Sequence, residues 1–314
     1  MDTDDPRLTK TLPPTPPPLV KPKKKSKPPK PKVGVVLGSG GMKAFAAIPL
    51  FEFLDQAGIA VDLLVGCSGG AIMCAAIGSG LTPAGIRQIA PDILNSKIFG
   101  SFNYRAILSI FSSRFGRFTP SSSIIRPDRM REIYQYLWGD KKLEDLCPRT
   151  LVQATDLMTG EGVVLSRGSV VDAVYASGAF FPVLPPLEIE GRWLSDGAYS
   201  APVPVIEAVK RNMDVIIALD FAERSTVQPE GFFDCFYRYI DTQMTTLKRS
   251  QMFQSIELHH HEIINIQVNF DQPISFRAAN ALDAVLAKGA EAVAHNKEAI
   301  LAAIHSFAET RREE

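Results

Sequence analysis

The chain has 314 residues, of which 46% are hydrophobic and 22% are charged, enough to build the core of one large α/β domain or of two smaller ones. The 34 basic and 34 acidic side chains cancel, and we expect no nucleic-acid partner. The four cysteines lack C-x-x-C spacing, which argues against a disulfide framework or a zinc site and indicates a reducing compartment.

Residues 1–32 differ in composition from the rest of the chain. They hold ten of the 23 prolines and nine basic residues against three acidic ones, a net charge of +6. Such a segment cannot bury enough apolar surface to fold, so we expect a disordered arm at 1–32 and one domain at 33–314. The arm is either a solvated spacer or a lysine-rich contact to an anionic membrane, and Pro13–Pro16 is a candidate polyproline ligand.

No targeting or membrane-spanning segment is expected. The chain starts with acidic residues, and its first apolar run, 33–37, is short. No stretch approaches the ~18 uninterrupted apolar residues of a membrane-spanning helix. We expect a cytoplasmic protein whose basic arm allows peripheral contact with the inner membrane face.

Strands and helices alternate in the first hundred residues. Apolar runs predict strands, and apolar residues at three- and four-residue spacing predict helices. We expect strands at 33–37 and 60–65 and helices at 42–56, from 71, and from 83 to about 94. This alternation is typical of a parallel sheet covered by helices on both faces.

Residues 96–127 break this pattern, because aromatic and aliphatic residues mix there with serine and arginine without one period. Two interpretations stay open: a mobile aromatic cap over a lipid-accepting cleft, and an irregular core insertion. Beyond them we expect helices at 129–138, 169–177, 233–247 and 278–293, and strands at 150–154, 162–165, 214–219 and 263–268.

A turn with one serine follows the second predicted strand. Residues 66–70, Gly-Cys-Ser-Gly-Gly, match G-x-S-x-G and stand between an apolar run and a helix-compatible stretch. At such a turn the serine takes strained backbone angles, and small neighbours prevent clashes. Its hydroxyl lies at the positive end of a helix, where an anionic intermediate is stabilised. We therefore predict Ser68 as a nucleophile.

The glycine loop before the first helix is a candidate oxyanion hole. Gly40 and Gly41 stand at a helix start, where backbone N–H groups are unpaired and glycine permits close approach. A dinucleotide-binding loop is the competing interpretation. It is disfavoured because Lys43 occupies the place of the third glycine of G-x-G-x-x-G.

The base that would activate the serine is open between two candidates. All five histidines come late, at 259–261, 295 and 305, and the order Ser68, Asp196, His259–His261 fits an α/β-hydrolase triad. Three consecutive histidines are more typical of a surface turn or helix end. Alternatively, Asp196 itself accepts the proton, although an Asp-Gly pair is also common in plain turns.

Together these motifs resemble the patatin-like phospholipase family, over about residues 33–305. The family's oxyanion loop resembles 39–43, its nucleophile elbow 66–70 and its Asp-Gly-Ala/Gly motif 196–198. Residues 154–161 and 175–186 also resemble family segments. Ser39 and Ala44 replace the outer glycines of the family's loop, and Lys43 lacks the bidentate contact that arginine would make with a phosphate.

The resemblance implies a three-layer α/β/α fold with a mostly parallel central sheet, of the patatin/FabD-lysophospholipase type. It also implies a lipid acyl hydrolase whose Ser68–Asp196 dyad needs no histidine, metal or cofactor. Backbone N–H groups of Gly40, Gly41 and Met42 would hold the oxyanion, and Lys43 would contact substrate. The alternatives are an esterase with a Ser-Asp-His triad and a non-catalytic patatin-fold scaffold, and lipid class and oligomeric state are left open.

Overall fold

A computed structural model describes residues 30–95, 102–223, 228–259, 262–271 and 281–313 of the chain. Within these ranges, eight strands form one mixed sheet in the order β5-β6-β3-β2-β1-β7-β8, with β4 paired to β3. The strands are β1 (Val33–Leu37), β2 (Leu63–Cys67), β3 (Arg149–Asp156), β4 (Gly162–Leu165), β5 (Leu187–Ile189), β6 (Arg192–Asp196), β7 (Val215–Glu223) and β8 (Glu262–Phe270). Strands β3, β2, β1, β7 and β8 are parallel, whereas β4, β5 and β6 add antiparallel pairs.

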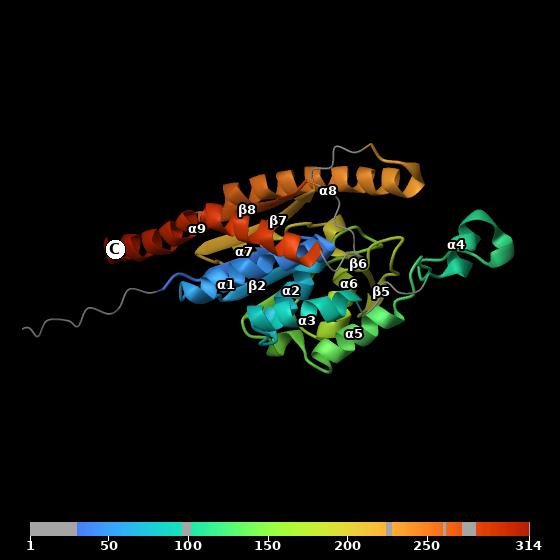
Figure 1. The fold of residues 1–314 in the computed structure, drawn as a ribbon, viewed down its shortest axis with the longest axis horizontal. Coiled ribbons are helices and arrows are strands. Elements are labelled where there is room, and N and C mark those ends of the chain that lie inside the picture. The colour runs from blue at the N-terminus through green and yellow to red at the C-terminus, as the bar shows by residue number, and fades with distance from the viewer. Residues whose placement is uncertain (1–29, 96–101, 224–227, 260–261, 272–280, 314) are drawn as a thin grey trace, which may run out of the picture.

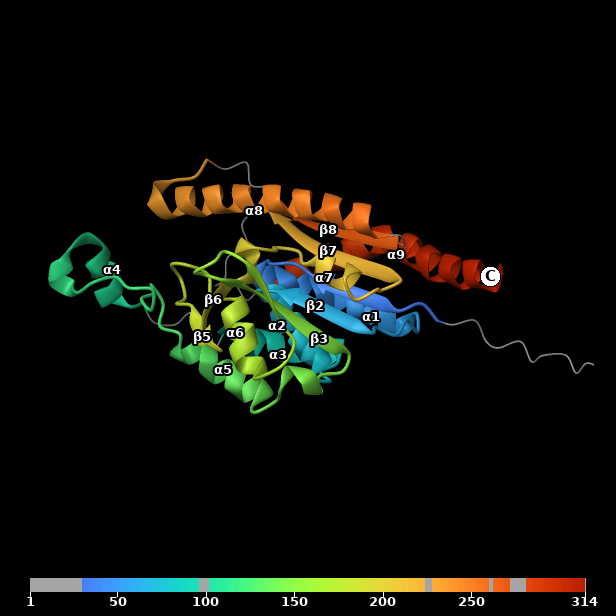
Figure 2. The same ribbon diagram turned by 180° about the vertical axis from the view of Figure 1, so that it is seen from behind.

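Helices cover both faces of this sheet (Figures 1 and 2). The α-helices are α1 (Ile48–Gln56), α2 (Gly69–Gly78), α3 (Pro83–Asn95), α4 (Tyr104–Phe111), α5 (Asp128–Trp138), α6 (Val170–Ser177), α7 (Val205–Val209), α8 (Gly231–Leu258) and α9 (Ala281–Glu313). The short 3-10 helices are η1 (Gly41–Ala47), η2 (Ser113–Phe115), η3 (Leu143–Asp145) and η4 (Gly197–Tyr199). The expected three-layer α/β/α fold with a mostly parallel sheet is confirmed.

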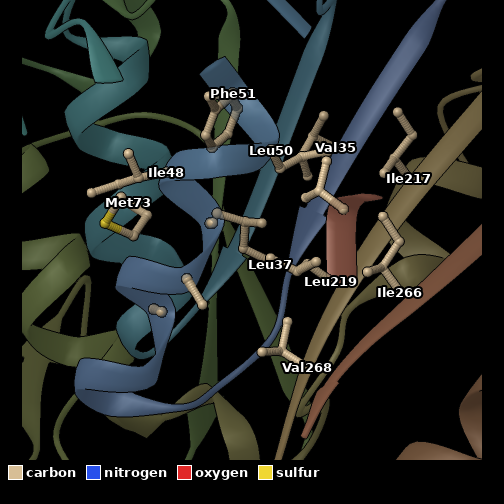
Figure 3. Packing of buried hydrophobic residues seen from close by; sticks show 14 of the residues in the cluster. Val35, Leu37, Ile48, Leu50, Phe51, Met73, Ile217, Leu219, Ile266 and Val268 are labelled. Atoms are coloured by element: carbon tan, nitrogen blue, oxygen red, sulfur yellow. The ribbon is translucent and has the colours of Figure 1, made fainter. Parts of the chain in front are cut away.

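The alternation of side chains along the buried strands separates two parts of the core. Val35 and Leu37 of β1 pack with α1, α2, α3 and α9. Figure 3 shows them among labelled residues of α1, α2, β7 and β8. Val36 points to the other face and packs with Val205 and Ala208 of α7. Each face of a strand thus buries every second residue. All five residues of β1 are buried, which is why its sequence reads as a continuous apolar run.

Most predicted elements are present, with differences in extent and in number. The helices expected at 233–247 and 278–293 extend further along the chain, as α8 to Leu258 and α9 to Glu313. The expected helix at 42–56 begins as the 3-10 helix η1 before it continues as α1. The short strands β5 and β6 and helix α7 had not been expected. The expected irregular segment 96–127 contains α4 and η2, while residues 96–101 and most of the expected arm, 1–29, lie outside the described residues.

One edge of β3 brings two distant parts of the chain together. Strand β4 pairs with residues 152–155 of β3, so β2 and β6 must share the opposite edge. On that edge β2 ends with Cys67 beside Gln153, and β6, running in the opposite direction, ends with Asp196 beside Ala154. The ends of β2 and β6 therefore meet.

Candidate active site

Ser68 occupies the sharp turn between β2 and α2. Its backbone angles, φ 52° and ψ −118°, lie in a region that L residues rarely adopt. The flanking glycines are required because a Cβ at Gly66 would overlap Ala71 and a Cβ at Gly70 would overlap the Leu37 carbonyl. The turn thus stores strain that the surrounding contacts maintain, and it places the hydroxyl at the start of a helix.

Ser68 and Asp196 are in contact although 128 residues separate them in the chain. The Ser68 hydroxyl donates to Asp196 Oδ2 at 2.9 Å. This contact follows from the sheet, since Ser68 directly follows β2 and Asp196 ends β6. Gly197 is needed at the same junction, because a Cβ there would overlap the Gln153 carbonyl and lie 3.0 Å from Cys67 Sγ.

The carboxyl group of Asp196 is held in a dry environment. The residue is 2% exposed, and its Oδ1 accepts the N–H of Ala198 at 2.9 Å. Its backbone is fixed by the Thr155 hydroxyl, which donates to the Asp196 carbonyl at 2.8 Å, and by the Ala179 carbonyl, which accepts the Asp196 N–H at 3.1 Å. Burial raises the pKa of Asp196 to about 7, and the hydrogen bonds from Ala198 and Ser68 oppose that rise.

The glycine loop lies against the serine turn. The N–H groups of Gly40, Gly41 and Met42 precede the first intrahelical bond of η1, which runs from the Lys43 N–H to the Gly40 carbonyl at 3.0 Å. Gly41 has φ +54°, which glycine adopts without strain. A Cβ at Gly69 would overlap the Gly41 backbone, so the loop and the start of α2 are in direct contact.

Lys43 makes an ion pair at the edge of this loop. Its Nζ lies 3.2 Å from Oε2 of Glu223, at the end of β7, and the two side chains are 19% and 26% exposed. The positive charge therefore has a carboxylate partner within the chain. A contact between Lys43 and substrate stays a prediction.

Of the described histidines, His259 lies near the end of the sheet opposite to Ser68, whereas His295 and His305 are exposed. Strand β8 starts with Glu262, which pairs with Val215, and Val215 pairs with Val33 at the start of β1. Ser68 lies beyond the opposite end of β1, so the rise of a strand separates the two positions by about 13 Å or more. His259 follows the end of α8 and stands three residues before this start of β8, and the two residues between them, 260 and 261, lie outside the described residues. His295 and His305 are exposed on α9.

Ser177 supports the turn and had not been predicted as a site residue. Its hydroxyl accepts the N–H of Ser68 at 2.8 Å and donates to the Gln153 carbonyl at 2.6 Å. The residue is fully buried at the end of α6. Its sequence neighbourhood resembled a family segment, but nothing in residue type or spacing linked it to a serine 109 positions earlier.

An aromatic stack connects the site to a neighbouring cavity. The ring of Phe180 stacks on Tyr199 at 5.3 Å and on Tyr237 of α8 at 5.8 Å, and Tyr199 follows Asp196 by three residues. The cavity has a volume of about 370 Å³. Its lining includes Phe180, Tyr237, Ile240, Met244 and the charged residues Glu223, Asp234, Arg238 and Asp241.

Known proteins are similar to part of this chain in sequence. An uncharacterized NTE family protein of Mycobacterium tuberculosis is 30% identical over 190 residues, which are 60% of this chain and 49% of that protein. Lysophospholipase nte1 of Emericella nidulans is 28% identical over 202 residues, 64% of this chain and 13% of that protein. The chain thus spans half or less of these relatives' length.

Among the described helices, we find none with the length and hydropathy of a membrane span.

A solved structure has a similar fold. The crystal structure of VipD from Legionella pneumophila aligns with a TM-score of 0.51 and 13% identity, over 90% of this chain and 67% of that one. The family model of patatin-like phospholipases matches residues 35–209, more than half of the chain, and includes both Ser68 and Asp196. The chain belongs to the patatin-like phospholipase family.

Proposed function

We propose that this protein is a serine acyl hydrolase that cleaves carboxylic esters of lipids through an acyl-enzyme. The observation that carries the proposal is the 2.9 Å hydrogen bond between Ser68 Oγ and the buried Asp196 carboxyl. A nucleophile needs a base at this distance, and a pKa of about 7 suits a base that must exchange protons near neutral pH. Membership of the patatin-like phospholipase family supports lipid esters as the substrate class.

In the first half of the reaction, the Ser68 hydroxyl attacks the ester carbonyl and Asp196 takes its proton. The negative charge that develops on the carbonyl oxygen is stabilised by the backbone N–H groups of Gly40, Gly41 and Met42 and by the N-terminus of α2. When the tetrahedral intermediate collapses, Asp196 returns the proton to the leaving alcohol. The acyl group is then bound to Ser68.

In the second half, a water molecule attacks the acyl-enzyme while Asp196 accepts one of its protons. The second tetrahedral intermediate uses the same N–H donors, and its collapse returns the proton to Ser68 and releases the fatty acid. No step requires a histidine. We also propose that the cavity beside Phe180 receives part of the lipid and that Lys43 contacts its polar part.

The test compares wild type with Ser68→Ala and Asp196→Asn on a lysophospholipid, a diacyl phospholipid, a triacylglycerol and a short soluble ester. Both variants should lose about 10³-fold or more of kcat, as nucleophile and base substitutions do in other serine hydrolases. A fluorophosphonate probe should label the wild type at Ser68. The control variant Ser121→Ala, changed at an exposed serine, should be labelled as the wild type is. An unlabelled wild type without ester hydrolysis would favour the non-catalytic scaffold.

A further inference from the structure

Residues 102–126, here named the α4 projection, carry apolar side chains into solvent. Helix α4 and its adjoining loops stand away from the body of the molecule in both views (Figures 1 and 2). Phe111 is 82% exposed and Tyr104 is 69% exposed. The other large apolar residues exposed there are Phe102, Leu108, Ile110 and Phe115. An apolar patch of this kind marks an interaction surface.

The charge of the α4 projection has a single sign. Residues 102–126 contain four arginines and no aspartate or glutamate. These arginines, at 105, 114, 117 and 126, are all exposed. Aromatic and aliphatic residues beside arginines are the combination that binds the interface of an anionic bilayer, where apolar groups enter the acyl boundary and cations meet lipid headgroups.

The base of the projection is hydrogen-bonded to residues 179–183, a segment that also contacts the backbone of Asp196. The N–H groups of Ile124 and Ile125 donate to the carbonyls of Pro182 and Val183 at 2.8 and 3.0 Å. Phe118 also packs edge-on against Phe181, with ring centroids 6.1 Å apart. That segment begins with Ala179, whose carbonyl accepts the Asp196 N–H, so the projection is anchored beside the dyad.

We propose that the α4 projection inserts into the surface of an anionic phospholipid bilayer and brings the Ser68–Asp196 site to the lipid interface. The inference deepens the proposed function and rests on it for the location of the substrate. Exposed aromatic side chains together with arginines, and without any acidic residue, favour an anionic bilayer as the partner. Two projections in contact would bring four arginines against four without acidic partners, which disfavours a contact between the projections of two copies of this chain.

The binding test uses all 314 residues with Ser68→Ala, so that the lipid is not consumed. Flotation with vesicles of phosphatidylglycerol and phosphatidylcholine compares this parent protein with two variants of it. One variant adds Tyr104→Ser and Phe111→Ser, and the other adds Arg114→Glu and Arg117→Glu. The matched control adds Tyr136→Ser on α5, because Tyr136 is 89% exposed outside the projection. Every protein keeps residues 1–32, so the basic arm contributes equally to each.

Both altered projections should bind these vesicles about tenfold or more weakly, whereas the Tyr136 control should bind normally. On pure phosphatidylcholine the parent protein should bind weakly, because a surface of zwitterionic headgroups has no net negative charge to attract the arginines. Equal binding by all four proteins would overturn the inference. The inference would also be overturned if sedimentation velocity showed that the parent protein is a dimer and that the variant with Tyr104→Ser and Phe111→Ser is a monomer.

A second measurement separates this inference from the proposed function. In the background with Ser68 intact, the projection variants should hydrolyse a soluble monomeric ester at the wild-type rate and vesicle lipid about tenfold more slowly. Vesicle binding by a protein that cleaves neither substrate would refute the proposed function alone. Equal loss on both substrates would overturn the docking role and assign the projection to the active site.

Discussion

The buried Asp196 carboxyl should make folding stability depend on pH, and Asp196→Asn tests this. An asparagine can accept the Ala198 N–H through its oxygen and donate to the Ser68 hydroxyl through its NH₂ group. Both hydrogen bonds of the carboxyl group, each 2.9 Å long, therefore have a counterpart in the variant. The substitution removes the titrating group and preserves the packing.

The expected size follows from the pKa of Asp196, which burial raises from 3.8 to about 7. Between these pH values the folded chain holds a proton that the unfolded chain has lost. The carboxyl group therefore has no destabilising effect below about pH 4, and lowers the free energy of unfolding as the pH rises, by about 4 kcal/mol above pH 7. In the variant this loss is absent.

Urea unfolding, followed by the fluorescence of Trp138 and Trp193, measures the effect. Other titrating groups cancel when the variant is compared with wild type at each pH. Between pH 5 and pH 8 the free energy of unfolding of Asp196→Asn, relative to wild type, should increase by about 3 kcal/mol. Over the same range the wild-type kcat/KM should rise through about pH 7, and the variant should stay inactive. A difference in free energy of unfolding that stays constant within about 0.5 kcal/mol over this pH range would refute the reasoning, because Asp196 would then titrate alike in the folded and the unfolded chain.

Three further substitutions test the surroundings of the dyad. Ser177→Ala leaves the Ser68 N–H without its acceptor, so urea unfolding should show a loss of about 1–3 kcal/mol and an ester assay a lower kcat. Gly69→Ala drives a Cβ into the Gly41 backbone, and initial rates should fall about 10²-fold or more in protein whose circular dichroism shows it folded. Changing His259–His261 together to alanine should keep kcat/KM within about twofold, whereas a loss of about 10³-fold would favour the triad.

The parts of this protein that could be predicted from its sequence are those that depend on near neighbours. The apolar run 33–37 predicts β1 because a strand buried on both faces needs every residue to be apolar. The turn at Ser68 could be predicted because its glycines and its strained backbone lie within five residues. Strands β5 and β6 were missed, since they are only three and five residues long and carry charged residues at exposed positions.

Tertiary structure decided what those local pieces do together. Ser68 and Asp196 were each identifiable as candidates, but their contact exists because β2 and β6 end beside adjacent residues of β3. The role of Ser177 follows from the same strand, whose Gln153 carbonyl it binds. The raised pKa of Asp196 likewise comes from burial by segments far away in the chain. Sequence spacing restricts the distance between two side chains only when they are a few residues apart. A contact across 128 positions therefore depends on which strands pair in the sheet.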